Sequence, residues 1–489
     1  MLVLGVAIPL VQFIFNRSLW YDEAMLGLNL VNRSPSDLLK PLDLLQVAPI
    51  LFLEVEKFFL WLWPSSEMGL RVFPLLCSFL SLFFFYRILK KVLTNKIAIL
   101  LALSLYVFDS ILVYYSSEVK QYMSDVLVAT VTCYLVLRDD QDYRLRFALL
   151  GLNGVFCIAL SSIAPIILLC TGLCLVFEMV CSRREYLFPL VGLALVWGIS
   201  FGAYYLAFIN NHPAREEMVQ FWAAREGFWL LNPLDRQFYV FLLHAFVGVF
   251  QYVLCPTLTA ALRFGVYSFL LSLLFAWGLV RLAVKRRVRE ILLFALPLLV
   301  HLVLSGFHLY PWGTRLILYA APGLIIVVAS ALDGLVETGL YRRFRLPFRL
   351  VALGLPVVAL AVFLRQGFPF QHEELKKSLA FIRSHASEAD AIYVYNGATP
   401  AFQYYRSTGQ GIELKTIIQG GTHNDDRPAY LAELHAIDGR CWLLFSHVYQ
   451  REDQFIIASM HAEGYEPLST FTTMGSSAYL FEFHGRTED

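Results

Sequence analysis

The sequence has little charge. Of its 489 residues only 16% are Asp, Glu, Lys or Arg, and the formal net charge is +1, whereas soluble domains contain about 25% charged residues. A net charge near zero gives no basic field for non-specific binding to nucleic acid. The low charge, together with 58% hydrophobic residues and a mean hydropathy of +0.60, predicts a membrane protein.

Motifs typical of soluble enzymes and metal proteins are also absent. The eight cysteines form no CxxC pair and no Cys/His zinc spacing. The sequence has no GxGxxG, no P-loop and no nucleophile elbow, so no motif supports a nucleotide-binding or hydrolase function. It has no internal repeat, which weakens the interpretation as a secondary transporter, because transporter folds are often built from repeated halves.

Apolar runs bounded by charged residues predict about eleven membrane-spanning helices, because a helix needs about 20 apolar residues to cross a bilayer. The runs are 2–15, 69–89, 97–114, 122–137, 147–160, 163–180, 187–209, 264–284, 291–309, 314–334 and 347–365. The first run lacks a basic start and a small-residue cleavage pattern, so we do not expect it to be a cleaved signal peptide.

Basic residues predict the orientation of these helices. They concentrate in alternate connections between the runs, at 87–96, 138–146, 183–184, 281–289 and 342–349. The positive-inside rule therefore predicts a cytoplasmic N-terminus. Two long connections, 16–68 and 210–263, and the chain after residue 366 are then expected outside. Within these connections, the aromatic-rich stretches 48–63, 221–231 and 238–254 predict helices in the outer membrane interface, with Trp61, Trp63, Trp222 and Trp229 as interface anchors.

The last part of the sequence changes character. Residues 390–396, 440–446 and 478–483 have the pattern of strands and alternate with helical patterns at 373–385, 428–436 and 451–463. We therefore predict a transmembrane domain over residues 1–365 and an outer, periplasmic-side soluble α/β domain over residues 366–489.

The first outer connection contains two adjacent acids, Asp22 and Glu23, directly after the first apolar run. Adjacent acids point in different directions on a helix or strand, so one can face a site while the other binds a neighbouring group or a cation. The alternative is a helix N-terminus stabilised by negative charge.

The second outer connection contains Glu118, Lys120 and Tyr122. It is too short to fold by itself, so its charges stay at the membrane surface. A lysine there can hold a lipid phosphate, and a glutamate can bind substrate hydroxyl groups or orient the lysine. The alternative is an ordinary solvated turn.

The third outer element contains His308, Tyr310 and Arg315. Arg315 starts an apolar helix, where an arginine is costly unless paired, and its planar guanidinium group suits a phosphate or a carboxylate. Tyrosine and tryptophan at this depth are often only interface anchors. His301 is expected to be a hydrogen-bonded core histidine, and Asp109 to face the interior of the bundle.

Several short motifs occur in order along residues 10–335 and resemble a known family. They are LWYDEA (19–24), QVAP (46–49), SEMGLR (66–71), YSSEVKQY (115–122) and YPWGTR (310–315). Together they resemble the dolichyl-phosphate-mannose protein mannosyltransferase and aminoarabinose transferase family of C-type integral-membrane glycosyltransferases. Two departures stand out: Ala48-Pro49 replaces the usual double proline, and Lys120 stands where many relatives have arginine.

The resemblance implies the fold and the donor. The fold would be a polytopic α-helical membrane protein with interfacial helices in the first outer loop and an outer soluble domain. The donor would be a polyprenyl-phosphate-linked monosaccharide. Asp22 maps to the first-loop acid proposed as the general base, and Lys120 and Arg315 would bind the phosphate. The further substrate-binding candidates are Glu23, Gln46, Glu118, Tyr122, His308 and Tyr310.

The predicted function is an inverting glycosyltransferase of the bacterial inner membrane. It would transfer the sugar to an envelope glycolipid, lipopolysaccharide, polysaccharide or protein at the outer face. We predict no required cofactor, no metal site and no nucleic-acid partner. Two alternatives remain: a lipid-linked saccharide flippase or transporter, which is a different class of protein, and an oligosaccharide ligase or polymerase of the same architecture.

Overall fold

The computed structural model describes residues 1–64, 66–138, 142–210, 212–254, 266–337, 345–423 and 426–484. Residues 342–344 of the basic connection and residues 255–263 of the second long connection lie outside this set. The chain divides into two compact units. The first contains Met1–Ile14, Pro35–Glu56 and Arg71–Phe370, and the second contains Phe15–Ser34, Lys57–Leu70 and Gln371–Asp489. The predicted division of the chain at residues 365/366 stays a prediction.

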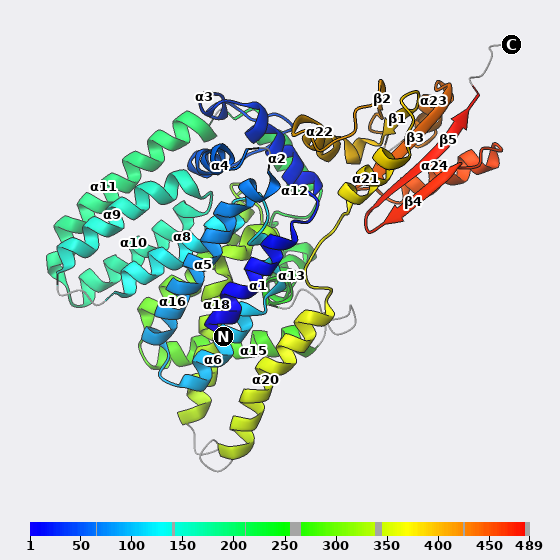
Figure 1. The fold of residues 1–489 in the computed structure, drawn as a ribbon. Coiled ribbons are helices and arrows are strands. Elements are labelled where there is room, and N and C mark those ends of the chain that lie inside the picture. The colour runs from blue at the N-terminus through cyan, green and yellow to red at the C-terminus, as the bar shows by residue number, and fades with distance from the viewer. Residues whose placement is uncertain are drawn as a thin grey trace. The chain divides into compact units, whose positions relative to one another are not determined.

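The first unit consists of helices (Figure 1). They are α1 (Leu2–Phe15), α3 (Pro35–Leu38), α4 (Ile50–Leu62), α5 (Glu67–Val92), α6 (Lys96–Val107), α7 (Ser110–Tyr115), α8 (Tyr122–Leu137), α9 (Tyr143–Leu160), α10 (Ala164–Cys181), α11 (Leu187–Tyr204), α12 (Arg215–Ala223), α13 (Arg236–Leu254), α15 (Val266–Val284), α16 (Val288–Phe294), α17 (Leu296–Gly306), α18 (Ala321–Glu337) and α20 (Arg345–Arg365). The ends of α1, α4 and α5 extend into the second unit.

Apolar helices of spanning length make the chain an integral membrane protein. Among the described residues, seven helical segments are long and apolar enough to cross a membrane, or eight if α16 and α17, bent by 43°, form one span. Apolar helices of 10–17 residues lie in four further predicted runs, at Leu2–Phe15, Lys96–Val107, Tyr122–Leu137 and Leu353–Arg365. The total of eleven spans stays a prediction.

The predicted run 97–114 is not one helix. The helix α6 ends at Val107, and α7 begins at Ser110. The reason is Asp109, whose Oδ1 accepts hydrogen bonds from the backbone N–H groups of Ile111 at 2.9 Å and Leu112 at 3.1 Å. A side chain that caps a new helix in this way ends the previous one. Asp109 is buried inside the unit, as predicted.

The three predicted interfacial stretches have different outcomes. Residues 48–63 contain α4, and residues 238–254 form most of α13. The prediction of a helix over 221–231 is wrong, because α12 ends at Ala223 and the chain then turns: Glu226 has a positive φ of 55°, and Gly227 N–H donates to the carbonyl of Trp222 at 2.8 Å. By length and composition α13 could itself cross a membrane, so its place in the interface stays a prediction.

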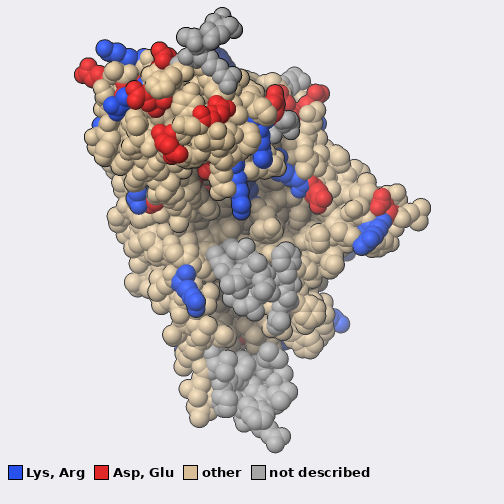
Figure 2. Space-filling model, turned by 90° about the vertical axis from the view of Figure 1, so that its right-hand side faces the viewer, with Lys and Arg blue, Asp and Glu red and all other residues tan. Residues whose placement is uncertain are grey.

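The distribution of buried and exposed side chains in the first unit is that of a protein surrounded by lipid. The helix α18 lies against α6 and α15, and its residues Leu324–Ala329 are almost fully buried. In contrast, α11 presents large apolar side chains outward, such as Phe188, 84% exposed, and Ile199, 70% exposed. On the face drawn in Figure 2, much of the surface is free of charged side chains. Such a surface is stable in hydrocarbon and costly in water.

The second unit contains a five-stranded sheet in the order β2-β1-β3-β5-β4. Its strands are β1 (Ala391–Val394), β2 (Thr416–Gln419), β3 (Gly439–Ser446), β4 (Ser469–Thr473) and β5 (Ser476–Phe483). The first three are parallel, and β5 is antiparallel to β3 and β4. The helices α21 (Leu375–His385), α22 (Thr399–Ser407), α23 (Pro428–His435) and α24 (Glu452–Ala462) complete this α/β domain, which the sequence predicts.

The first-loop helix α2 (Tyr21–Asn32) belongs to the second unit, where it packs against α22. Leu26, Gly27 and Leu30 of α2 are buried. A Cβ atom on Gly27 would lie 3.2 Å from the ring of Tyr404, so the absence of a side chain allows this close approach. The helix that contains Asp22 is therefore part of the same compact unit as the C-terminal sheet.

Candidate active site

Lys120 and Gln46 meet in the first unit. Lys120 Nζ donates a 2.7 Å hydrogen bond to Gln46 Oε1, and both side chains are more than nine-tenths buried. Gln46 follows a tight bend in which Leu44 and Leu45 have positive φ angles of 57° and 54°. The structure thus joins two residues that the sequence selects from different loops.

The loop before Lys120 is a compact, buried turn. Ser116 Oγ donates to the carbonyl of Val113 at 2.6 Å, and the backbone N–H of Lys120 donates to the carbonyl of Glu118 at 2.7 Å. Glu118 and Val119 are fully buried. The alternative of an ordinary solvated turn does not describe this loop, because its charged side chains are withdrawn from solvent.

Arg315 lies between two aromatic rings of the first unit. Its guanidinium carbon is 5.9 Å from the ring centre of Tyr122 and 5.9 Å from that of Trp222. Aromatic faces attract a guanidinium group and hold its plane while its N–H groups still donate. A Cβ atom on Gly313 would lie 2.6 Å from the Trp222 ring, so a glycine here lets the indole approach.

Two loops of the first unit support Arg315. The backbone N–H of Trp312 donates to the carbonyl of Gly227 at 2.7 Å, and that of Trp229 donates to Ser305 Oγ at 3.1 Å. His308 has a positive φ of 56° and stacks on Phe228, with ring centres 4.4 Å apart. His308 therefore joins the two loops, and its predicted role in substrate binding stays a prediction.

His301 holds the 3₁₀ helix η3 (Arg315–Ala320), which begins at Arg315 and leads into α18. The histidine is fully buried, its Nδ1 lies 3.2 Å from Tyr319 Oη, and its Nε2 lies 3.0 Å from the carbonyl oxygen of Pro311. Tyr310 packs edge-on against the His301 ring at 4.9 Å. His301 is the hydrogen-bonded core histidine that the sequence predicts, and Tyr310 is part of the same cluster.

The two acids of the first loop lie in the second unit, in the first turn of α2. Glu23 is fully buried, forms an ion pair with Arg17, and accepts a 3.2 Å hydrogen bond from the backbone N–H of Trp20. Its carboxylate thus caps the helix. Asp22 is half-buried, and burial together with the charge of Asp22 raises the pKa of the neighbouring Tyr21. The structure therefore gives the two acids different surroundings.

The predicted residues fall into two sets. Gln46, Glu118, Lys120, Tyr122, His308, Tyr310 and Arg315 belong to the first unit, and Asp22 and Glu23 belong to the second. Within the first set, Lys120 contacts Gln46, and Arg315 contacts Tyr122. Sequence reasoning missed Arg17 and the contact between Trp222 and Arg315. A buried carboxylate such as that of Glu23 needs a cationic partner. This requirement was the signal that could have led to Arg17, which is six residues before Glu23 in the sequence.

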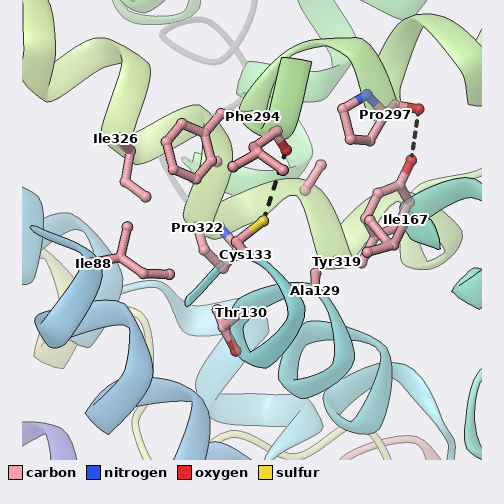
Figure 3. A pocket seen from close by; sticks show the side chains of 13 residues that line it. Ile88, Ala129, Thr130, Cys133, Ile167, Phe294, Pro297, Tyr319, Pro322 and Ile326 are labelled. Atoms are coloured by element: carbon pink, nitrogen blue, oxygen red, sulfur yellow. Dashed lines mark hydrogen bonds between the residues drawn. The ribbon is translucent and has the colours of Figure 1, made fainter. Parts of the chain in front are cut away.

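An apolar pocket lies among the spans of the first unit (Figure 3). None of the 13 residues that line it is charged, and Ile88, Phe294 and Ile326 are among them. Two hydrogen bonds join one lining residue to another, from Cys133 Sγ to the carbonyl of Leu293 and from Tyr319 Oη to the carbonyl of Pro297. The volume of the pocket is about 20 Å³, which leaves room for about one water molecule and not for a hydrocarbon tail.

Within the described ranges, no group of three or more His, Cys, Asp and Glu side chains is arranged to hold a metal ion. The expectation that no metal is required stays a prediction.

The helices of the first unit and the sheet of the second unit define a polytopic α-helical membrane protein with a C-terminal α/β domain. Among solved structures, the chain is similar to ArnT from Cupriavidus metallidurans in the apo state, with a TM-score of 0.52 and 12% sequence identity. The match covers 98% of this chain and 97% of the ArnT chain. ArnT from the same organism bound to undecaprenyl phosphate gives a TM-score of 0.49 at the same identity and coverage. No family model matches the sequence. No curated protein matches it either. The apo comparison confirms the fold that the motifs predict.

Proposed function

We propose that the protein is a glycosyltransferase that moves a monosaccharide from a polyprenyl-phosphate donor to an envelope acceptor at the outer face of the bacterial inner membrane. One observation supports this most: Arg315, chosen from a distant loop, lies beside Tyr122 at the end of the loop that contains Lys120. Lys120 is two residues before Tyr122, and the guanidinium group of Arg315 lies over the Tyr122 ring. A lysine and an arginine can both donate charge-assisted hydrogen bonds to a lipid phosphate.

The roles of the residues follow from the chemistry of the transfer. Asp22 accepts the proton of the acceptor hydroxyl group as its oxygen attacks the anomeric carbon. The bond between that carbon and the phosphate oxygen breaks, its electron pair leaves with the polyprenyl phosphate, and the anomeric configuration inverts. Lys120 and Arg315 stabilise the negative charge that develops on the phosphate, so no general acid is needed. Glu118 orients the sugar or its phosphate.

One feature of the structure supports the lipid donor: the fold is similar to that of ArnT in the apo state. The membrane helices supply hydrocarbon surroundings for the polyprenyl tail, and the loops supply the cations for its head group. The loop acids and cations also distinguish the proposal from a structural scaffold, which would have no use for them.

The decisive test is transfer by the purified full-length protein in detergent. The donors are undecaprenyl phosphates with single pentoses or hexoses, labelled in the sugar, and the acceptors are envelope extracts from a strain that lacks the protein. The expected result is label in an acceptor and release of undecaprenyl phosphate. Movement of intact donor across proteoliposomes without cleavage would identify a flippase. Use of only long lipid-linked glycans would identify a ligase or polymerase.

A further inference from the structure

We infer that the C-terminal α/β domain positions the Asp22 carboxylate through three positioning residues, Tyr405, Lys376 and His447. This inference rests on the proposed role of Asp22 as the base. All contacts that support it lie within the second compact unit, which contains both the first-loop segment Phe15–Ser34 and the domain Gln371–Asp489.

The backbone before Asp22 is held by Tyr405 and Lys376. The N–H of Leu19 donates a 2.8 Å hydrogen bond to Tyr405 Oη, and Leu19 is fully buried. Lys376 Nζ donates to the carbonyl of Asn16 at 2.6 Å, and the backbone N–H of Lys376 donates to Ser18 Oγ at 3.1 Å. Three backbone or side-chain groups of residues 16–19 are thus bound by the C-terminal domain.

The residues beside Asp22 are held by His447. Its ring stacks on Tyr21, with ring centres 4.5 Å apart and planes 6° apart, and meets Trp20 edge-on at 5.5 Å. His447 follows the last residue of β3 with a positive φ of 51°. The left-handed backbone conformation at His447 turns the chain out of the strand direction. The His447 ring contacts Tyr21 of α2.

The His447 ring is itself fixed by Glu373. His447 Nδ1 lies 2.8 Å from Glu373 Oε1, and Ser446 Oγ donates to Glu373 Oε2 at 3.1 Å. Glu373 is buried. A carboxylate that binds Nδ1 sets the rotation of the imidazole ring, as second-sphere carboxylates do for metal-bound histidines. The plane on which Tyr21 stacks is therefore determined by the C-terminal domain.

Together these contacts fix the chain at three positions around Asp22. Leu19 is held three residues before Asp22, Tyr21 directly before it, and Gly27 rests on the Tyr404 ring one turn and a half later. A catalytic base must be placed to within a fraction of an ångström, and a misplacement of about 1 Å can cost about 100-fold in rate. The position of Asp22 thus depends on residues more than 350 positions away in the sequence.

Hydrogen exchange tests the holding of the segment without any substrate. The full-length protein in detergent is compared as wild type, Tyr405→Phe, His447→Ala and a control, His461→Ala. His461 lies on α24, and its ring pairs with Glu466 in the loop after this helix. Amides in residues 16–28 are expected to exchange about tenfold faster in the first two variants, through loss of one hydrogen bond or one ring contact, and unchanged in the control. Wild-type exchange in both variants would overturn the inference.

Transfer kinetics separate positioning from substrate binding. With the donor that the wild type uses, His447→Ala is expected to lower kcat about tenfold while the KM values for donor and acceptor stay within about twofold. His447→Phe keeps a ring against Tyr21 and is expected to recover most of kcat. An unchanged kcat, or a change in KM alone, would contradict positioning.

The variant Asp22→Asn distinguishes the proposed role of Asp22 as the base from the inferred positioning of Asp22 by the C-terminal domain. If this variant transfers sugar normally, the base assignment in the proposed function is wrong, whatever the exchange rates show. If Asp22→Asn is inactive while His447→Ala and Tyr405→Phe retain the wild-type kcat, only the positioning inference fails.

Discussion

Lys120 donates a hydrogen bond to Gln46 across 74 residues of sequence, and both side chains are buried. A buried ammonium group needs partners for its N–H donors. The amide oxygen of Gln46 is such a partner. The hydrogen bond therefore fixes the position of the Lys120 ammonium group beside Gln46.

Replacing Gln46 is expected to weaken use of the donor. In Gln46→Met the lysine loses a neutral partner and its fixed position, so the donor KM should rise about tenfold with a smaller change in kcat. The measurement is a donor titration in the transfer assay. Lys40→Met is the control, because Lys40 is exposed and pairs only locally with Asp37. An unchanged donor KM in Gln46→Met would remove this pair from the phosphate site.

Arg315→Lys is expected to lower kcat/KM for the donor about tenfold, since a lysine keeps the charge but loses the planar group between Tyr122 and Trp222. Trp222→Leu should act in the same direction. The matched control is Arg225→Lys, because Arg225 lies 3.6 Å from the ring centre of Phe221 and is solvent-exposed. Equal losses of kcat/KM in Arg315→Lys and Arg225→Lys would show that the substitutions act through folding and not through the donor site.

Asp22→Asn is expected to reduce transfer about 1,000-fold at an unchanged level of folded protein, because an amide cannot accept the proton. Its isosteric shape preserves the first turn of α2. Asp37→Asn, an exposed acid of the same long connection, should transfer at the wild-type rate. Near-normal transfer by Asp22→Asn would exclude this residue as the base.

The stability of the C-terminal domain should depend on pH through Glu433. Burial alone would raise the pKa of Glu433, but hydrogen bonds from His423, Tyr393 and Gly421 lower it below its ordinary value of 4.5. A lowered pKa means that the ionised carboxylate stabilises the fold above pH 4.5, and that this stabilisation is lost as the pH falls through the folded pKa.

Glu433→Gln should therefore unfold several degrees below the wild type at pH 7, and the difference should shrink as the pH falls below 4.5. The measurement is thermal unfolding of the full-length protein in detergent at both pH values. Glu388→Gln, an exposed acid of the same domain, serves as the control. A difference that persists unchanged at low pH would show that the Glu433 charge is not responsible.

The sequence predicts the helices of the membrane unit well where apolar runs are long and uninterrupted. The bounds of α8, residues 122–137, agree with the predicted run. The break at Asp109 escaped prediction, because one capping side chain outweighs an apolar pattern. In the C-terminal domain, β2 and β4 were missed. Both are short edge strands with several exposed residues, so neither has the continuous apolar run of a central strand.

The candidate site was predictable only in part, for a physical reason. Motif order selects Lys120 and Arg315, because their residue types suit a phosphate. It does not show that Trp222 covers Arg315, since a tryptophan near a membrane surface is ordinarily an interface anchor. Contacts such as that of Tyr405 with Leu19 join residues 386 positions apart, and no local spacing reveals them. Tertiary packing alone brings them together.

The second compact unit is assembled from three separate stretches of chain, and this has a consequence for biosynthesis. Residues 15–34 and 57–70 leave the ribosome long before residues 371–489, with which they pack. Domains generally fold in the order of their synthesis, but this unit cannot be completed until the end of translation. The helix α2, which contains Asp22, therefore remains without its final partners while the membrane helices are inserted, and a truncated or nascent chain would lack the contacts that hold this helix.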